Sequence, residues 1–237
     1  MISVDLPVPP VALAIGAHSD DIEFGCGATL AKWAAAGAEV HMCVCTDGSK
    51  GTWDPSADLA ALVKLRQEEQ ADAARTLGVK QVHQLGFVDG ELDHELAARA
   101  AVAEVIRKTK PVVVLGHDPW KQYRFHPDHR HAGLLAIEGI VAARDPHFFP
   151  EQRLAPCRPE ILLLFEAQRI DHVENVDGYV DTKIEALLCH RSQWISTMAI
   201  ENDADRERWV RTQHEDARTT GLYAGLRYAE AFARMTP

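Results

Sequence analysis

Short apolar runs rich in β-branched residues alternate along this chain of 237 residues with longer stretches in which apolar residues recur every three or four positions. The short runs have the composition of buried strands, and the longer stretches have the period of amphipathic helices. The predicted strands cover residues 11–17, 40–45, 82–85, 112–116 and 161–165. The predicted helices cover residues 29–36, 59–77, 92–108 and 128–143.

This alternation predicts an α/β fold, a Rossmann-like and mostly parallel sheet with helices on both faces, because parallel strands are joined by crossovers that place helices on the sheet. After residue 159 the pattern changes to one strand followed by long polar helical stretches, which predict a C-terminal helical subregion packed on the sheet. No internal repeat, low-complexity tract or flexible linker interrupts the sequence. We therefore expect residues 1–237 to form a single domain, and 46% apolar residues suffice for its core.

The chain carries a net charge of −10 and has an isoelectric point near 5.6. Nucleic acids and anionic membrane surfaces repel such a protein, so a small molecule is the expected partner. No stretch approaches the roughly 20 apolar residues that cross a bilayer, and Asp5 differs from the basic start of a signal sequence. These features predict a cytoplasmic protein, and they leave its assembly open, a homo-oligomer included.

Cysteine usage agrees with a reducing compartment. The five cysteines are odd in number and show no C-x-x-C spacing. Cys43 and Cys45 would lie on one face of a predicted strand, where burial as small apolar groups is favoured over metal binding.

Two acidic-histidine motifs lie about a hundred residues apart, AHSDDIE at residues 17–23 and HPDH at residues 126–129. Each is expected on a loop between a predicted strand and a predicted helix. Ligands of parallel sheets bind where the carboxyl ends of the strands open into such loops. The two motifs are therefore expected to meet at one edge of the sheet.

The motifs together supply two imidazoles and a carboxylate, from His18, Asp21 and His129, and this is a catalytic zinc ligand set. Three protein ligands leave a fourth position for water, whose pKa zinc lowers from 15.7 toward about 7. Asp20, beside the ligand Asp21 but pointing elsewhere, is the expected general base for that water.

His126 is expected to face the same pocket from the other side, and Asp128 is expected to orient its second ring nitrogen. Each motif alone also has a structural interpretation. Adjacent aspartates commonly cap a helix, and Pro127 with Asp128 suits the first turn of one. The conjunction of both motifs at one edge favours the metal site. His117, at the end of the fourth predicted strand, is interpreted either as a pocket residue or as a structural histidine.

The loops at residues 46–55 and 118–125 follow the second and fourth predicted strands, so both should hang over the same edge and form pocket walls. Their tryptophans, Trp53 and Trp120, are expected to contact substrate. Arg124, which ends the second loop, is expected to contact substrate as well.

At these motifs the chain resembles the PIG-L/LmbE-like superfamily of zinc-dependent N-deacetylases, which carry AHPDDxE near the N-terminus and HPDHxxAG later. Residues 17–23 and 126–133 match them, and lesser features match at residues 25–30, 66–69, 85–90 and 190–193. Ser19 and Ala28 depart from the usual proline and glycine, and Arg124 stands where some sugar deacetylases place a tyrosine.

The resemblance implies that His18, Asp21 and His129 bind Zn²⁺ and that Asp20 is the general base. It also implies that His126 with Asp128 stabilises the oxyanion or serves as acid, and that Arg66 and Asp89 line the substrate end of the pocket. The implied reaction is hydrolysis of the N-acetyl group of an amino sugar or glycoconjugate.

Two rival functions are weighed against the deacetylase. Some members of the superfamily resemble hydratases that act on an unsaturated dicarboxylic acid, but the pair Asp20 and Asp21 favours hydrolysis. A non-catalytic module that binds a sugar or nucleotide is the other rival. It is disfavoured because the first predicted strand leads into no G-x-G-x-x-G loop.

Overall fold

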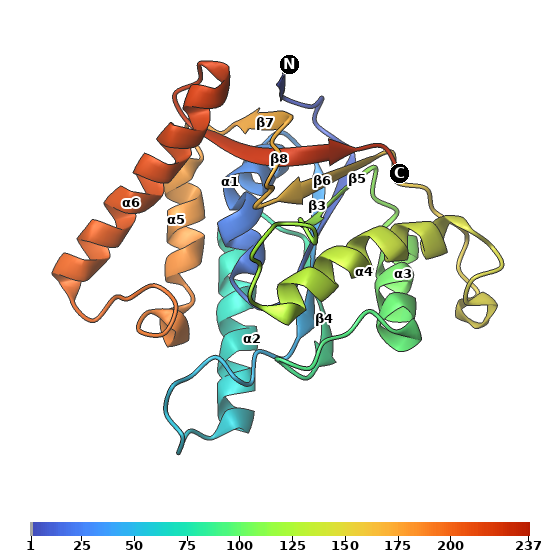
Figure 1. Ribbon diagram of the computed structural model, residues 1–237, viewed down its shortest axis with the longest axis horizontal. Helices are drawn as coiled ribbons and strands as arrows, with labels where there is room; N and C mark the ends of the chain where they lie inside the picture. The colour runs from blue at the N-terminus through green and yellow to red at the C-terminus, as the bar shows by residue number, and fades with distance from the viewer. Residues whose placement is uncertain (1) are drawn as a thin grey trace.

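The computed structural model describes residues 2–237, which form a mixed sheet of eight strands with helices packed on it (Figure 1). The strands are β1 (Ser3–Val4), β2 (Val11–Gly16), β3 (Glu39–Thr46), β4 (Gln81–Phe87), β5 (Val113–His117), β6 (Ile161–Phe165), β7 (His172–Asn175) and β8 (Ala229–Met235). The α-helices are α1 (Asp21–Ala35), α2 (Leu59–Thr76), α3 (Leu96–Thr109), α4 (Pro127–Arg144), α5 (Val180–Leu188) and α6 (Asp203–Gly221). Short 3-10 helices are η1 (Pro150–Gln152), η2 (Arg191–Gln193) and η3 (Leu222–Ala224).

The strand order is β1-β7-β8-β6-β5-β2-β3-β4. Strands β6, β5, β2, β3 and β4 run parallel to one another. Strand β8 runs antiparallel to both of its neighbours, β6 and β7. The predicted α/β class is thus confirmed. From β2 the chain moves to β3 and β4 on one side and then returns to β5 on the other side. The carboxyl ends of β2 and β5 therefore form a switch point, where the loops diverge and leave room for a ligand.

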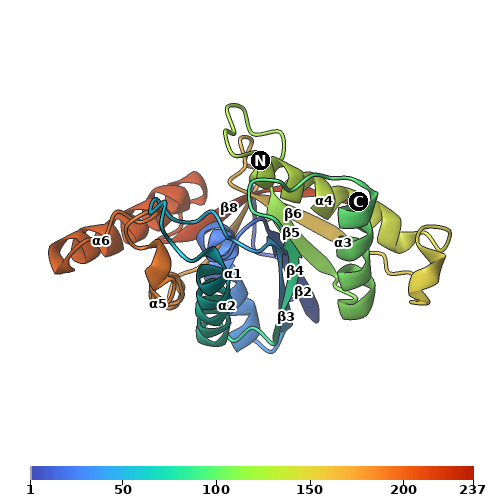
Figure 2. The same ribbon diagram turned by 90° about the horizontal axis from the view of Figure 1, so that it is seen from below.

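Helices cover both faces of the sheet, with α1 and α2 on one face and α3 and α4 on the other (Figure 2). A hydrophobic core lies on each face of the sheet, and β2 contributes alternating side chains to both. Ala12 and Ala14 belong to the first core, and Leu13 and Ile15 belong to the second. This alternation follows from the two-residue period of a strand that is buried on both faces. Cys43 and Cys45 are fully buried in the second core, as predicted.

The first helix differs from its prediction, since α1 begins at Asp21 and not at residue 29. A kink at Cys26, with φ −154°, divides the helix between Gly25 and Gly27. Gly25 is required there because a Cβ would lie 2.4 Å from the Phe165 ring. Asp21 therefore sits in the first helical turn, which gives its carboxylate a fixed direction.

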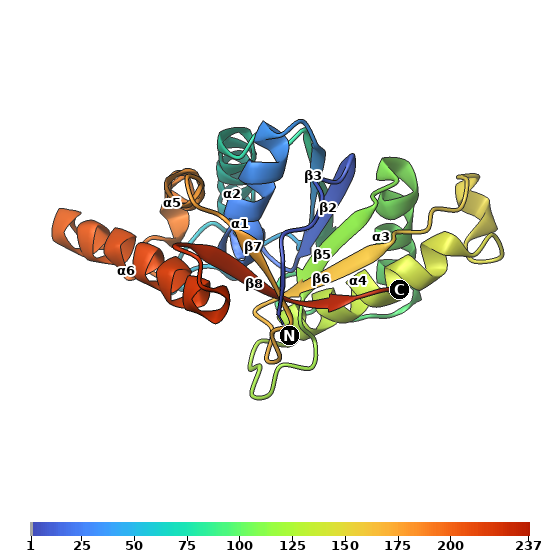
Figure 3. The same ribbon diagram turned by 90° about the horizontal axis from the view of Figure 1, so that it is seen from above.

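The C-terminal region contains the predicted helices α5 and α6, but the sequence missed β7 and β8. Strand β8 lies between β6 and β7 and completes that side of the sheet (Figure 3). Its sequence, AEAFARM, consists mostly of helix formers. Pairing with two strands and burial of Phe232 override that local preference. Among the described residues, no helix is both long and apolar enough to span a membrane.

Candidate active site

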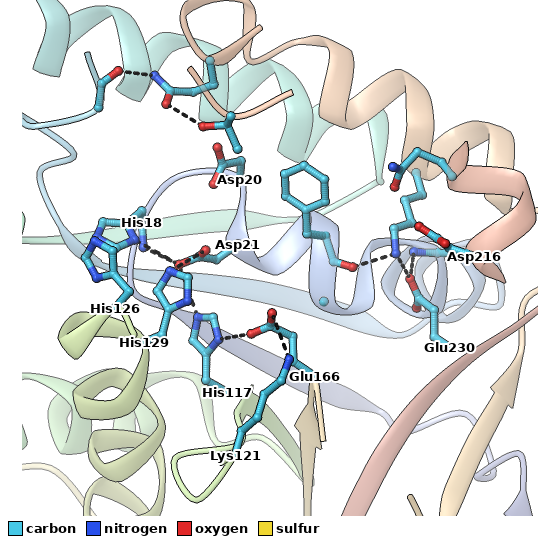
Figure 4. Close-up of a pocket in the computed structure, with 18 of the residues that line it drawn as sticks. His18, Asp20, Asp21, His117, Lys121, His126, His129, Glu166, Asp216 and Glu230 are labelled. Carbon is cyan, nitrogen blue, oxygen red and sulfur yellow. Dashed lines mark hydrogen bonds and ion pairs between the residues drawn. The ribbon is translucent and has the colours of Figure 1, made fainter. Parts of the chain in front are cut away.

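The first motif leaves the carboxyl end of β2 through a strained turn. Asp20 has φ 90°, a region that non-glycine residues rarely adopt and that costs on the order of 1–3 kcal/mol. The turn separates the two neighbouring aspartates: Asp21 points toward a group of histidines, whereas Asp20 lies apart from them (Figure 4). One strained residue thus gives the adjacent carboxylates different surroundings.

Three imidazoles surround the Asp21 carboxylate. Its Oδ2 atom lies 3.3 Å from Nδ1 of His18 and 3.2 Å from Nε2 of His117, and its Oδ1 atom lies 3.2 Å from Nε2 of His129. The backbone N–H of His18 also donates to Oδ2, at 2.8 Å. Burial opposes ionisation of Asp21, but the neighbouring His129 and His117 hold the pKa of its carboxyl well below the usual value.

The predicted ligands can share one metal ion. The donor atoms of His18, Asp21 and His129 lie within 4.8 Å of one another, and the three side chains line the same cavity. Two imidazoles and one carboxylate, with an open side toward the cavity, fit the donor set of a catalytic zinc site. Two overlapping groups also have this spacing, His18 with Asp89 and His126, and His117 with His129 and Glu166. The Asp21 group is favoured because its carboxylate faces both histidines of the predicted set.

The far side of the His18 ring is held by two carboxylates. Its Nε2 atom lies 3.1 Å from Oδ1 of Asp89 and 3.2 Å from Oδ2 of Asp128. Although burial acts to lower the pKa of His18, hydrogen bonds with Asp128, Asp21 and Asp89 raise it well above its usual value. Carboxylates placed behind a ligand imidazole fix its orientation and increase its basicity.

The expected pairing of Asp128 with the His126 ring is therefore not what the structure shows. His126 is the N-cap of α4, and its Nδ1 accepts a hydrogen bond from the backbone N–H of Asp128 at 3.3 Å. The Asp128 side chain turns instead toward His18 and the backbone N–H of Gly90. Helix geometry causes this difference, because the cap residue and the first turn face different directions.

His126 lies at the cavity surface, with its ring centroid 4.7 Å from that of His18. Burial and the neighbouring His18 and His129 lower the pKa of His126. Its imidazole is thus neutral at pH 7. Because Nδ1 acts as an acceptor, the proton of the neutral ring resides on Nε2.

Asp20 lines the cavity with a carboxylate that is buried but lacks a hydrogen-bond donor among the described residues. Burial raises the pKa of Asp20 to about 6, and the charge of Arg66, whose Nη2 atom lies 3.8 Å away, opposes that rise. Behind it, Oε1 of Gln70 accepts the backbone N–H of Asp20 at 3.3 Å, and Nε2 of Gln70 donates to Glu23. The backbone of Asp20 is therefore held in place, and its carboxylate remains free to accept a proton.

The expected substrate-contacting residues divide into two groups. Arg66, Asp89 and Trp53 line the cavity. Arg124 does not: its Nη1 atom pairs with Glu166 at 2.8 Å, beneath the histidine cluster, because that carboxylate offers a buried guanidinium its charge partner. Trp120 also lies outside the cavity lining, since the Asp118 side chain closes a turn by accepting the Trp120 N–H and the ring remains 58% exposed.

Of two further residues at the site, the sequence left the role of His117 open and did not identify Glu166. His117, left open between pocket and structure, is buried and its ring stacks on that of His129 at a centroid distance of 4.5 Å. Glu166 contacts His117 with 3.0 Å between Oε2 and Nδ1. Glu166 directly follows β6, which was a predicted strand. Its position at the carboxyl end of that strand could have identified it as a site residue from the sequence.

These side chains open onto a cavity of about 870 Å³. The histidine cluster occupies one end, and Asp216 and Glu230 lie at the other (Figure 4). Phe24 and Lys183 also line the cavity. This volume lies in the range of small-molecule sites, about 300–1,000 Å³.

Comparisons with known proteins agree with this geometry. A family model described as PIG-L, GlcNAc-PI de-N-acetylase, matches residues 13–140. The diacetylchitobiose deacetylase of Thermococcus kodakarensis is 34% identical over 221 residues, which span 92% of this chain and 80% of that protein. The structure of the N,N'-diacetylchitobiose deacetylase from Pyrococcus horikoshii matches with a TM-score of 0.87 and 31% identity, covering 96% of this chain and 84% of that one. The 4-carboxy-2-hydroxymuconate hydratase of Pseudomonas putida matches with a TM-score of 0.77 over 96% of both chains but is 23% identical, so this likeness extends to the fold alone.

Proposed function

The chain belongs to the PIG-L family of GlcNAc-PI de-N-acetylases, and from this premise we propose that it is a zinc-dependent hydrolase that removes the N-acetyl group of an amino sugar or glycoconjugate. The observation that carries the proposal is the separation of Asp20 from Asp21. One carboxylate faces three imidazoles, whereas its neighbour lies at the wall of the same cavity with Arg66 3.8 Å away and accepts no side-chain hydrogen bond from the described residues. Metal binding and proton transfer are thereby divided between adjacent residues.

We assign the metal to His18, Asp21 and His129. When bound, zinc supplies positive charge that polarises an acetamido carbonyl and lowers the pKa of water toward about 7. Asp89 and Asp128 hold the far nitrogen of the His18 ring, so this ligand is already oriented. The matching ligand set supports zinc, and a metal analysis of the purified protein identifies the ion.

Asp20 removes a proton from the attacking water. Its pKa of about 6 leaves it ionised at pH 7 and makes it a stronger base than an exposed aspartate. The water oxygen bonds to the carbonyl carbon, the C–N bond then breaks, and the amine nitrogen gains a proton. The products are acetate and a protonated primary amine, so the atoms of one amide and one water are accounted for.

His126 donates a hydrogen bond to the developing oxyanion. The Asp128 backbone N–H occupies Nδ1 of His126, so the Nε2–H of the neutral ring is free to point into the cavity. A donor directed at charge that develops in the transition state contributes about 10²–10³ in rate. The lowered pKa of His126 favours this role over that of a protonated acid.

No observation favours the rival functions. The resemblance to a hydratase extends to the fold, and folds are shared by different chemistries. A non-catalytic module has no use for a strained turn that directs one aspartate to the histidines and the other to the cavity. We also propose a cytoplasmic location, which cell fractionation tests.

The decisive experiment measures products. Zinc-loaded protein is incubated with acetamido sugars that are free, glycosidically linked or nucleotide-linked, and acetate and primary amine are quantified together. Equal amounts of both from at least one compound are expected, and the Asp20→Asn protein serves as the matched control. Water addition to an unsaturated dicarboxylate without amine release from any acetamido sugar would reject the deacetylase.

A further inference from the structure

The cavity has a second end that catalysis does not use. It lies between α1, α5, α6 and β8, and Figure 4 shows Glu230 and Asp216 far from the histidine cluster within the same cavity. We call this end the distal pocket and define it by Phe24, Val176, Lys183, Asp216, Thr220 and Glu230. Because it is continuous with the reaction site, it lies within reach of a group attached to the acetamido sugar.

The floor of the distal pocket is apolar and its rim is polar. Val176 and Val180 belong to a small core between α1, α5 and α6, and both line the cavity. Helix α6 contributes an amide, a carboxylate and a hydroxyl to the rim, from Gln213, Asp216 and Thr220. A sugar ring combines an apolar C–H face with hydroxyl groups at its edge, so this lining suits a ring of that kind.

The charge of Lys183 is already neutralised. Its Nζ atom donates to Oε1 of Glu230 and to the backbone carbonyl of Phe24, both at 2.7 Å. Glu230 in turn accepts the backbone N–H groups of Ala28 and Thr29, at 3.2 and 2.8 Å. This ion pair is therefore part of the fold and offers no unpaired cation to a ligand.

The other cations along the cavity are similarly engaged. Lys50 pairs with Glu91 at 2.9 Å, and Arg66 donates to the carbonyl oxygens of Gly48 and Ser19. Lys121 faces Glu166 at 3.9 Å.

Asp216, in contrast, has no cation partner in the part of the chain that the structure describes. The distal pocket thus has an unpaired negative charge and no unpaired positive one. A phosphate group at this position would be repelled by the Asp216 carboxylate and would find no unpaired cationic side chain in the distal pocket.

We propose that the distal pocket is the subsite for the group attached to the acetamido sugar, and that it selects an uncharged hydroxylated group, such as a second sugar ring, over a phosphate ester. This inference rests on the proposed deacetylase function. It assigns the selection to α6, through Asp216 and Thr220, which lie away from the reacting atoms.

The test compares two substrates that share N-acetylglucosamine, one linked to a second uncharged sugar and the other to phosphate. For the unaltered protein, kcat/KM is expected to be at least about tenfold higher for the disaccharide, with the difference mainly in KM. Asp216→Lys should reduce that preference about tenfold by accepting the phosphate. Glu215→Lys makes the same change of charge at an exposed neighbour outside the cavity, and it should leave the preference unchanged.

A second pair of variants tests whether the linked sugar occupies the distal pocket, with substitutions that do not change the charge. Thr220→Trp narrows the distal pocket and should lower the ratio of kcat/KM for the disaccharide to that for free N-acetylglucosamine about tenfold. Thr219→Trp places the same bulk on the exposed side of α6 and should preserve that ratio.

Equal kcat/KM for both linked substrates would overturn the subsite while leaving the deacetylase intact. The same conclusion would follow if Asp216→Lys kept the preference for the disaccharide over the phosphate ester and Thr220→Trp kept the ratio of kcat/KM for the disaccharide to that for free N-acetylglucosamine. Absence of amine from every compound would instead remove the proposed function and the inference with it.

Discussion

The Nε2 atom of His117 lies 3.2 Å from Oδ2 of Asp21, and the other ring nitrogen of His117 lies 3.0 Å from Oε2 of Glu166. His117 belongs to neither motif, yet it connects the predicted ligand Asp21 to a carboxylate that follows β6. His117 and His18 thus contact the same carboxylate oxygen of Asp21. A residue supplied by β5 therefore supports the ligand Asp21 at the start of α1.

We predict that His117→Phe weakens zinc binding about 10–100-fold, the range typical of groups that orient metal ligands. The phenyl ring preserves the stacking volume but cannot hydrogen bond to Asp21. His117→Gln, which retains an N–H donor, should recover part of the affinity. A competition titration with a chromophoric chelator measures the affinities, and wild-type affinity in His117→Phe would contradict the positioning role.

The ligand set predicts the metal content. His18→Ala, Asp21→Ala and His129→Ala should each fall well below the stoichiometry of the unaltered protein, which we expect to bind about one zinc per chain, because each removes one of three donors. His147→Ala, at an exposed histidine remote from the site, serves as control. Full zinc by elemental analysis in any of the three variants would show that its residue is not a ligand.

Asp20→Asn should keep the metal and lose about 10²–10⁴ in kcat, since the amide preserves shape but cannot accept a proton. Zinc content and turnover are measured on the same preparation. Near-native turnover at full zinc occupancy would assign the base to another group.

The raised pKa of Asp20 also predicts a change in stability. In the metal-free protein its pKa is about 6 when folded and near the usual 3.8 when unfolded, so the folded state holds the proton more tightly. The ionised carboxylate therefore destabilises the fold fully above pH 6, and this cost disappears as pH falls toward 3.8. Metal-free Asp20→Asn should melt higher than the metal-free parent at pH 7, by a margin that shrinks at pH 4.5. An equal or lower melting temperature at pH 7 would contradict the assignment of burial as the cause.

His126→Ala should reduce kcat about 10²–10³-fold with little change in KM, because the Nε2–H is proposed to act on charge present only in the transition state. His126→Gln, which retains a donor, should retain more activity. A rise in KM at unchanged kcat would make His126 a ground-state binding residue.

Much of the site could be predicted because its residues are close in sequence. His18, Asp20 and Asp21 share one turn, and His126, Asp128 and His129 share the start of α4. The spacing of these residues along the sequence was therefore enough to identify both groups. The two motifs meet as expected, with His18 at one carboxylate oxygen of Asp21 and His129 at the other.

Orientation was harder to predict than position. Arg124 and Trp120 were expected in the pocket wall, but pairing with the Glu166 carboxylate holds the buried Arg124 side chain beneath the cluster, and a turn leaves the Trp120 ring in solvent. Asp128 was assigned to its sequence neighbour His126 and instead contacts His18, 110 residues away along the chain.

The sequence by itself determined the parallel α/β core, because its strands are apolar on both faces and its helices have one apolar stripe, and it determined the chemical groups of the two motifs. The tertiary structure alone decided how those groups are supported and what surrounds the substrate. His117 and Glu166 gained their roles from the neighbouring positions of β5 and β6, and the distal pocket arose where β8 brings Glu230 against Lys183 of α5. Local periodicity records which face of an element is buried, whereas a contact between distant elements depends on sheet order and helix packing, which no short window of sequence contains.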